Sequence, residues 1–443
     1  PTHPMPKPTA KLSRKTKHTP AGEIPADWGC VKLGALLTIK HGFAFDSKNF
    51  SSVGDYILLT PGSFYEVGGY RDQKNKTKFY TGKVPEEYVL KQNDLLVAMT
   101  EQAEGLLGSA LRVPLSGKFL HNQRLGLVET NNKNAVDLDF VYWIYNNPKS
   151  RRQISRTASG TKVHHTSPSK LLDFFVALPP LSEQRKIASI LSTWDTALEK
   201  LDALIRAKQQ QKKALMQQLL SGRMRLPGFD KSKGERVPDR FNQYPKDWTH
   251  LRLGSVTRES TKRNSGNEGL PVLSCTKHRG LVLSEEYFGK KIYADNLSDY
   301  KVVKREQFAY ATNHIEEGSI GLLDFCEAGL VSPIYTVFSV KDGVQSKYLF
   351  RLLKSPLLIH LYRINTSASV DRRGSLKYKE FANIKVWLPS IAEQIEINRI
   401  LENCDREIHL LTQQRESIDL QKRGLMQRLL TGRVRVNNHT SNS

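Results

Sequence analysis

One segment of this chain occurs twice, and the repeat constrains the fold more than any other feature. Residues 177–226 align with residues 387–436 without a gap, at a constant offset of 210, and nineteen of the fifty pairs are identical. A weaker repeat, at an offset of 220, relates residues 24–34 to residues 244–254. Because an internal duplication fixes the architecture, we expect an unlike block followed by a repeated segment, twice in succession.

The charge of the chain narrows the class of its partners. Lys and Arg exceed Asp and Glu by 67 to 44, a formal net charge of +23 in 443 residues. Such an excess favours a polyanionic partner over mere solubility, and nucleic acid fits better than an acidic membrane because no basic amphipathic helix is evident. No apolar run reaches the ~18–20 residues that span a bilayer, and no secretory signal or paired-cysteine motif is recognised. We therefore expect a cytoplasmic nucleic-acid-binding protein without structural zinc.

The blocks between the repeats mix both kinds of secondary structure. Short β-type runs such as YILLT (56–60) and FAYAT (308–312) are separated by Gly, Asn and Pro, and each block closes on a strand that runs into Leu-Pro. The predicted fold class is α+β: two domains of one mixed type that alternate with two long helices. The predicted organisation is a disordered basic arm (1–23), a first mixed domain (24–180), a first long helix (181–222), a linker (223–243), a second mixed domain (244–389), a second long helix (390–432) and a tail (433–443).

Each repeated segment is typical of one helix of about forty residues, or ~60 Å. Apolar residues recur at steps of three and four, and Gly222 and Gly432 stand where a left-handed C-cap belongs. A helix of that length cannot bury its stripe alone, so we expect an antiparallel coiled coil whose polar middles (206–213 and 412–417) meet. The alternative is two helices docked separately on their own domains. The residues expected to pair are Ile187, Leu191, Trp194, Leu198, Leu201, Ile397, Leu401, Ile408 and Leu411.

These motifs make the chain similar to the specificity subunit of Type I restriction-modification systems. The resemblance rests on LPPLSEQRKIASIL (178–191), on LMQQLLSGRMRL (215–226) and on the second copy of both, and it covers roughly residues 24–436. In the second block, GLVSPIYTVF (329–338) and RRGSLKYKEFANIKVWLP (372–389) also resemble the target-recognition domains of that family. The first block is less typical, although GTKVHHTSPSKLLDFFVALP (160–179) has the closing pattern.

The resemblance implies that the two mixed domains are target-recognition domains, each reading one half of a bipartite, asymmetric DNA site. The helices would form a spacer that sets the distance between the half-sites and docks two methyltransferase (modification) subunits. Restriction/translocase subunits would join the full complex, and the methyl donor and ATP would belong to those partners. The alternatives are a coiled-coil adaptor with basic RNA- or DNA-binding domains, and an enzyme with an unrecognised catalytic domain. Two unlike copies of one domain favour the specificity subunit, because reading two different half-sites requires them.

No catalytic motif accompanies these features. The phosphate loop GxxxxGK[ST], the N/D-P-P-Y/F tetrapeptide of amino-methyltransferases and GxGxxG after a strand are all missing from the sequence. The adjacent His164 and His165 have no Cys, Asp or Glu at ligand spacing, and Lys162 and Lys170 beside them favour contact with phosphate or bases. We therefore expect a non-enzymatic subunit with no metal and no cofactor of its own.

Candidate DNA contacts are loop residues whose side chains match the donors and acceptors of base edges. Two loops come first, because Ser159 lies twenty residues before Pro179 and Ser369 lies twenty residues before Pro389. Many protein–DNA hydrogen bonds go to the backbone, so several candidates are expected to be phosphate contacts or plain surface charge. The candidates are Lys40, His41, Arg71, Lys74, Lys76, His121, Asn122, Arg124, Arg151, Arg152, Arg156, Ser159, Lys162 and His164 in the first domain, and Arg258, Lys262, Arg263, Lys277, His278, Arg279, Asn313, His314, Arg363, Ser369, Arg372 and Arg373 in the second.

Overall fold

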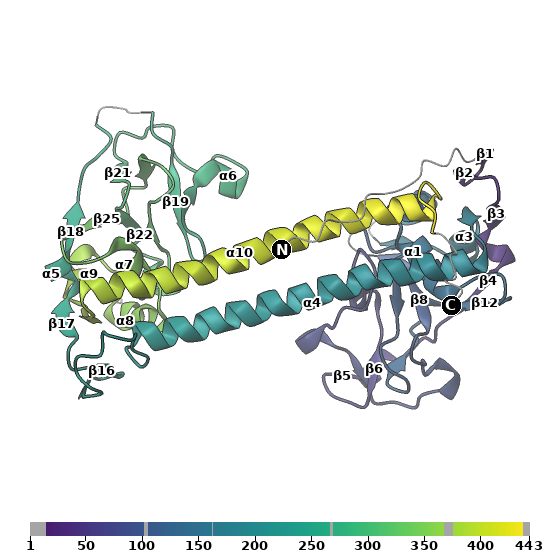
Figure 1. Cartoon of the computed structure of the whole chain (residues 1–443), viewed down its shortest axis with the longest axis horizontal. Helices are drawn as coiled ribbons and strands as arrows, with labels where there is room; N and C mark the ends of the chain where they lie inside the picture. Colours follow the sequence, from purple (N-terminus) through teal and green to yellow (C-terminus); the bar gives the residue numbers. More distant parts are fainter. Residues whose placement is uncertain (1–14, 102–104, 162, 266–268, 367–374, 437–443) are drawn as a thin grey trace, which may run out of the picture. The chain divides into compact units, whose positions relative to one another are not determined.

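The computed structural model describes residues 15–101, 105–161, 163–265, 269–366 and 375–436. The chain divides into two compact units (Figure 1). Unit 1 contains residues 1–202 and 414–443, and unit 2 contains residues 203–413. The division falls inside both long helices, α4 (Leu181–Leu220) and α10 (Ile391–Leu430). Each unit therefore holds one mixed domain, one half of α4 and one half of α10.

Among its described residues, unit 1 carries short strands and three short α-helices before α4 begins. Its elements are β1 (Thr16–Thr19), β2 (Gly22–Pro25), β3 (Gly29–Lys32), β4 (Leu37–His41), β5 (Phe50–Ser51), β6 (Tyr56–Leu58), β7 (Phe79–Tyr80), β8 (Leu95–Ala98), β9 (Thr100–Glu101), β10 (Ala110–Arg112), β11 (Phe119–Leu120), β12 (Leu125–Thr130), α1 (Leu138–Asn146), α2 (Pro148–Arg156), β13 (His164–His165), α3 (Pro168–Leu172) and β14 (Phe175–Leu178).

Unit 2 carries a similar series between α4 and α10. Its elements are β15 (Arg236–Pro238), β16 (Gln243–Pro245), β17 (Thr249–Arg252), α5 (Leu253–Val256), β18 (Thr257–Ser260), β19 (Leu273–Thr276), β20 (Gly280–Leu283), α6 (Ser284–Phe288), β21 (Lys301–Lys304), β22 (Phe308–Ala311), β23 (Ile320–Leu322), β24 (Ala328–Val331), β25 (Tyr335–Val340), α7 (Ser346–Leu353), α8 (Pro356–Asn365), α9 (Tyr378–Asn383) and β26 (Lys385–Leu388).

The two units share one sheet topology. The central four-stranded sheet has the order β10-β8-β12-β4 in unit 1 and β23-β22-β25-β18 in unit 2, with every neighbouring pair antiparallel. A pair of short helices follows the sheet in each unit, α1–α2 or α7–α8. The closing strand pairs with the strand of the weaker repeat, β14 with β3 and β26 with β17. The predicted α+β class with two domains of one type is confirmed.

The units differ in what surrounds this shared frame. Unit 1 adds the sheet β11-β6-β7-β5, whereas unit 2 adds the two-stranded sheets β19-β20 and β21-β24. Apolar clusters separate from the main core lie beneath these additions. The inserted elements are therefore where the unlike blocks have diverged, while the frame has kept its order.

Two segments are more ordered than the sequence predicted. Residues 15–23 of the expected disordered arm contribute to the hairpin β1–β2, in which Thr16 is opposite Pro25. The expected linker, 223–243, contains β15, which pairs with β16. Both hairpins lie against the end of a long helix, where Pro25 approaches Gly432 and Arg236 donates to Gly222 O at 2.9 Å. Residues 1–14 and 437–443 lie outside the described ranges.

The long helices pair in an antiparallel manner through charged side chains. In unit 1, Lys422 binds Asp195, and Arg415 binds Asp202 with an Nε–Oδ1 distance of 3.1 Å. Residue numbers thus fall along α10 as they rise along α4, which defines the antiparallel direction.

The helices are also antiparallel in unit 2, and their register there differs from the expected contact between the polar middles. The ammonium of Lys208 lies 2.7 Å from Glu407 Oε1, and Lys212 binds Asp405. The expected contact between the polar middles is wrong, because residues 206–213 face the acidic stretch around Asp405 rather than residues 412–417. Opposite charges across a helix pair favour this register.

The apolar stripes of the helices are covered partly by the domains. Ile187 and Leu191 share a core with Phe140 and with the last turns of α10, around Leu429. Ile397 and Leu401 occupy the equivalent core of unit 2, together with Leu219 and Leu220 of α4. Leu198 is buried, whereas Trp194, Leu201, Ile408 and Leu411 lie further along the helices and are half-buried. None of the helices among the described residues is long and apolar enough to cross a membrane.

Identical residues of the repeat join each long helix to its domain. Gln184 donates to Pro179 O and accepts from the backbone N–H of Asp137, at the start of α1. Gln394 donates to Pro389 O and accepts from the N–H of Gln345, at the start of α7. Both glutamines are buried. Each amide thus satisfies backbone groups that have no partner within a helix.

Each long helix ends in a glycine that lies against the weaker repeat. Gly222 and Gly432 have φ angles of 67° and 70°, as expected of a left-handed C-cap. A Cβ at Gly222 would lie 2.5 Å from Pro245, and one at Gly432 would lie 2.4 Å from Pro25. Both positions therefore require glycine for two reasons: the backbone has a positive φ angle, and a proline ring leaves no room for a Cβ atom.

Candidate nucleic-acid interface

In unit 1, the backbone brings three exposed candidates together at one end of the central sheet. Lys40 and His41 end β4, opposite Leu127 and Gly126 of β12, and Arg124 stands immediately before β12. The Nζ atom of Lys40 lies 5.4 Å from the centre of the Tyr88 ring, a cation–π distance that fixes the side chain loosely. The three candidates are exposed and carry donors suited to phosphates or base edges.

A second group in unit 1 contains the loop that the sequence ranked first. Ser159 forms a bridge with His165, and β13 pairs with β9 so that His164 is opposite Glu101. The Glu101 side chain is 2% exposed and lies 3.2 Å from His164 Nδ1. It also accepts from the N–H groups of Leu106 and Leu107 at 2.8 and 2.7 Å. No sequence motif pointed to Glu101, whose carboxylate joins two loops far apart in the chain.

Three candidates in unit 1 are engaged within the protein itself. His121 is 1% exposed and its ring bonds to Leu125 O at 3.0 Å. Desolvation by burial lowers its pKa to about 4, so the ring is neutral at pH 7. Asn122 is buried and accepts from the backbone N–H of Arg124. Arg151 donates to three backbone carbonyls, among them Leu107 O at 2.7 Å. These three side chains make contacts within the fold, and their role in DNA binding stays a prediction.

Of the other candidates in unit 1 that the structure describes, all but Arg71 are exposed. Arg71 is half-buried and its Nε donates to Gly62 O at 2.9 Å. Lys74 and Lys76 are exposed in a short 3₁₀ helix (Lys74–Lys76), and Arg152 and Arg156 are exposed on α2. Lys162 lies outside the described residues. The exposed side chains are spread over several elements, as expected of a surface that follows a polyanion rather than a single pocket.

In unit 2, three consecutive candidates occupy the tip of one hairpin. Lys277, His278 and Arg279 connect β19 to β20, and all three are exposed. The Thr276 hydroxyl closes the turn: it accepts from Arg279 N–H at 3.0 Å and donates to Gly280 O at 3.2 Å. The tip therefore presents two cationic side chains and an imidazole on a defined turn.

The remaining candidates in unit 2 are exposed or partly engaged. Arg258 is exposed on β18. Arg263 pairs with Asp299 at 2.7 Å, and the Arg363 Nε donates to Glu316 O at 3.3 Å. Lys262 is exposed and lies next to Arg263. The predictions that lie outside the described residues, the second top-ranked loop among them, are Ser369, Arg372 and Arg373.

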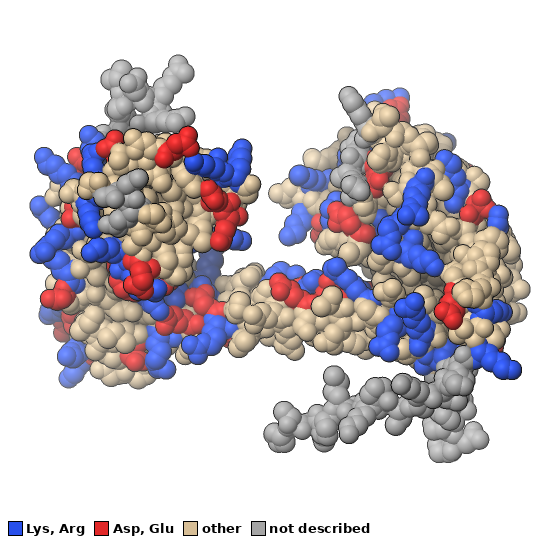
Figure 2. Space-filling view, turned by 90° about the horizontal axis from the view of Figure 1, so that it is seen from above, with Lys and Arg blue, Asp and Glu red and all other residues tan. Residues whose placement is uncertain are grey.

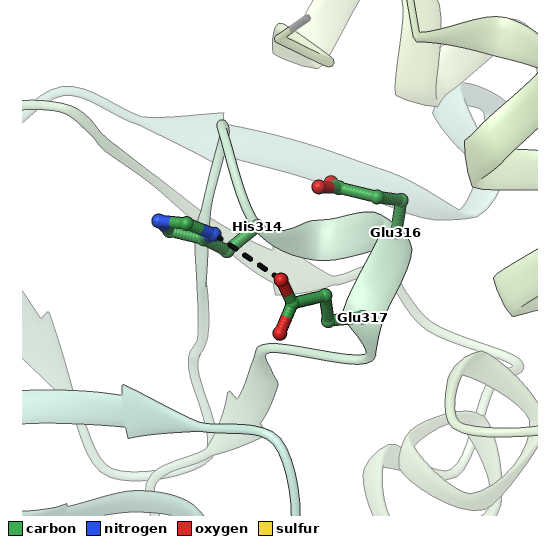
Figure 3. A group of neighbouring side chains, drawn as sticks. All are labelled: His314, Glu316 and Glu317. Carbon is green, nitrogen blue, oxygen red and sulfur yellow. Dashed lines mark ion pairs between the residues drawn. The ribbon is translucent and has the colours of Figure 1, made fainter. Parts of the chain in front are cut away.

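Asn313 and His314 follow β22, next to two glutamates (Figure 3). Ligating atoms of His314, Glu316 and Glu317 lie within 4.8 Å of one another. His314 Nδ1 is 3.7 Å from Glu317 Oε1, and both side chains are about half exposed. Figure 3 shows these two side chains turned toward each other, with the Glu316 carboxylate apart from them. His314 and Glu317 lie at ion-pair distance, which becomes an ion pair when the imidazole is protonated, and we assign no metal to the group.

The surface of each unit is rich in basic side chains. Figure 2 shows, on the face drawn, areas of Lys and Arg on both units with areas of Asp and Glu among them. The basic excess of the sequence therefore reaches the surface of both units. A basic surface of this kind supplies affinity for phosphates that does not depend on sequence, while polar loops supply discrimination between bases.

The duplicated frame matches a known family model twice. The Type I restriction modification DNA specificity domain matches residues 25–209 and again residues 245–420. The specificity subunit of the Type I restriction enzyme MjaVIII, from Methanocaldococcus jannaschii, is 25% identical over 94% of this chain and 95% of its own length. The EcoBI specificity subunit from Escherichia coli is 24% identical, covering 86% of this chain and 79% of the relative.

Solved structures show the same fold. The specificity subunit from M. genitalium superposes with a TM-score of 0.52 at 16% identity, covering 91% of this chain and 96% of that one. A chain from a study of assembly in a Type I restriction-modification system gives a TM-score of 0.56 at 17% identity, covering 93% and 99%. The family model and the relatives favour the predicted function over an adaptor outside restriction-modification. Two copies of the family domain, each beginning at one copy of the weaker repeat, show that the chain belongs to the specificity subunits of Type I restriction-modification systems, with two target-recognition domains.

Proposed function

We propose that this chain is the non-catalytic DNA-reading subunit of its complex, and that each unit reads one half of a bipartite site. The observation that carries the proposal is a shared sheet order with unlike insertions. A common frame would present both readers in the same manner, and different loops would give them different targets. The sequence contains no motif for binding a methyl donor or a nucleotide, so the chemistry belongs to partner subunits.

The proposed partners are double-stranded DNA, two methyltransferase subunits and, for cleavage, restriction/translocase subunits. The helix pair would set the spacing between the half-sites and dock the methyltransferase subunits. Its support is the register, which charged pairs fix in both units. We also propose that the complex works in the cytoplasm, where four cysteines without disulfides would stay reduced.

A domain exchange tests the proposal. Residues 244–389 are replaced by the corresponding block of another specificity subunit, and the complex with its methyltransferase subunits is used to methylate DNA. Sequencing of the methylated bases is expected to show one new half-site and one unchanged half-site. The reciprocal exchange of residues 24–180 is the matched control and is expected to change the other half. A change in both halves after a single exchange would contradict the assignment of one half-site to each unit.

A further inference from the structure

A half-buried lysine in unit 2 holds three backbone carbonyls. Lys354 is the C-cap residue of α7. Its Nζ atom donates to Lys277 O at 2.8 Å, to Gly318 O at 2.9 Å and to Ile320 O at 3.3 Å. An ammonium has three donors, so this set of acceptors uses them all.

The three carbonyls belong to two separate segments. Lys277 O lies in the β19–β20 tip, whereas Gly318 lies in the turn before β23 and Ile320 begins that strand. Strand β20, which follows the tip, packs closely on β23, because a Cβ added at Gly321 would lie 2.3 Å from the backbone nitrogen of Leu281. The hairpin is thus held at its tip by the ammonium of Lys354 and along β20 by a glycine contact with β23.

The arrangement is poorly suited to stability alone. Among the described residues, Lys354 forms no ion pair with a carboxylate, and desolvation by burial lowers its pKa below the usual value for a lysine. The Phe350 ring, whose centre lies 5.8 Å from Nζ, and the Cys275 thiol are also neighbours of the ammonium. A partly buried charge that contacts only neutral groups loses hydration free energy, and no opposite charge offsets that loss. The placement of the tip therefore accounts for this ammonium better than a contribution to stability does.

The equivalent position in unit 1 makes a smaller contact. Asn146 lies two residues before Pro148, which begins α2, and Lys354 lies two residues before Pro356, which begins α8. The Asn146 amide donates to Ala110 O at 3.2 Å and accepts from Ala110 N–H at 2.9 Å. The two side chains therefore occupy the same place in the shared frame.

The two contacts differ in how far the side chain extends. Ala110 and Ile320 begin equivalent strands, β10 and β23, so Asn146 and Lys354 bind the same point of the frame. The Asn146 side chain lies against the turn Tyr65–Gly69, because a Cβ added at Gly68 would be 2.3 Å from its Cγ. The longer Lys354 side chain instead donates to a carbonyl of the β19–β20 tip itself, Lys277 O. Both units thus hold an inserted turn at this point of the frame, and unit 2 does so with an ammonium group.

We infer that Lys354 is a positioning residue for the half-site that unit 2 reads: its ammonium group fixes the β19–β20 tip, with Lys277, His278 and Arg279, against the turn before β23. The inference rests on the proposed function of unit 2 as a reader of DNA. Direct readout depends on the placement of donors against base edges. A tip released from Lys354 would keep its charge but lose its defined position, so discrimination would fall more than affinity.

The test measures methylation by the assembled complex with Lys354→Met. Substrates are the cognate site and sites with single base changes in one half or the other. We expect the preference for the cognate site over changes in the unit 2 half to fall about tenfold, the order of one well-placed base contact. Discrimination in the other half is expected to stay unchanged, and Lys354→Arg is expected to retain most of the selectivity.

Lys341→Met is the matched control. The Nζ atom of Lys341 also holds two carbonyls of unit 2, Gly254 O at 3.0 Å and Ser255 O at 3.1 Å, but neither belongs to the tip. Selectivity of the Lys341→Met complex is expected to equal that of the wild-type complex. Unchanged selectivity in Lys354→Met, or an equal loss in both halves, would overturn the inference.

A second measurement covers the case in which Lys354→Met fails to fold. Amide hydrogen exchange is then compared between the wild-type chain and Lys354→Gln. Faster exchange confined to residues 276–280 is expected, and exchange that is unchanged or faster throughout unit 2 would refute the positioning role. A wild-type complex that methylates no bipartite site would instead refute the proposed function.

Discussion

Two arginines explain why the repeats of the sequence carry the residues they do. Arg435 binds Glu183 and Asp27 in unit 1, with Nε–Oε1 and Nη2–Oδ2 distances of 2.7 Å each. Its guanidinium also lies 5.3 Å from the centre of the Trp28 ring. Charge-assisted bonds raise the pKa of Arg435, the largest contribution coming from Glu183 and the next from Asp27. One side chain thus connects the end of α10 to the start of α4 and to the weaker repeat.

The same contact occurs in unit 2, one repeat earlier in the chain. Arg225 binds Glu393 at 2.9 Å and Asp247 at 2.8 Å, and it lies 5.9 Å from the centre of the Trp248 ring. The recurrence of these residues was visible in the sequence, at two different offsets, 210 and 220. The reason for this recurrence was not visible, because the arginine, its carboxylate partners and the tryptophan come together only in the folded chain, where the end of each long helix contacts a domain. A residue-level repeat could therefore be predicted, and its ion-pair network could not.

A buried histidine gives unit 1 a pH dependence. His121 has a pKa of about 4 in the folded chain because burial disfavours its charged form, against 6.5 for the ordinary group. The unfolded chain therefore binds more protons between these values. The stability contribution is complete above pH 6.5 and is lost as the pH falls toward 4, by up to about 3 kcal/mol. We expect His121→Gln to flatten the pH dependence of the unfolding free energy over that range, measured by urea titration at several pH values.

His165→Gln serves as the control for the histidine prediction. His165 is exposed on β13, in the same unit. Its replacement is expected to leave the pH profile of unfolding as in the wild-type chain. A wild-type slope that persists in His121→Gln would show that another group binds the protons.

At the scale of elements, the sequence predicted helix length and direction but not helix register. Apolar steps of three and four indicated a stripe, and glycine C-caps marked the ends. The register depends on which charges face one another across the pair, such as Lys208 with Glu407. Apolar stripes of this kind fit several registers equally well, and only the three-dimensional pairing selects one. The polar middles were misplaced for that reason.

The helix pair also carries a prediction about spacing. Four residues inserted into α4 and four into α10, at facing positions, add about 6 Å to each helix. Since one base pair rises ~3.4 Å along the duplex, the non-specific gap between the half-sites is expected to lengthen by about one or two base pairs. Sequencing of methylated DNA from the assembled complex reads this gap directly.

The insertion has a control of its own. Lengthening α4 alone breaks the register of the charged pairs, and we expect a less stable chain rather than a new spacing. An unaltered gap in the doubly lengthened protein, with methylation intact, would refute the role of the helices as a spacer.

At the scale of the whole chain, duplication was the most informative feature of the sequence. It predicted two domains of one type, because a repeat at constant offset leaves few other architectures. The recognition surface was less predictable. His121 and Arg151 are residues of the types that contact DNA, yet His121 is buried and both side chains bind backbone carbonyls of the fold. Lys354 and Glu101 were missed, because a side chain that positions a loop has no motif.

Without its partner subunits, the purified chain is expected to bind DNA but not to modify it. Its basic surface is expected to bind DNA with an affinity that falls steeply as salt rises, since each neutralised phosphate releases counterions. Neither methylation nor cleavage is expected, because the sequence holds no motif for binding a methyl donor or a nucleotide. The assay incubates purified chain with DNA and a labelled methyl donor, and then adds the methyltransferase subunits. Methylation must appear only after the addition, and incorporation by the chain alone would defeat the proposal that it is non-catalytic.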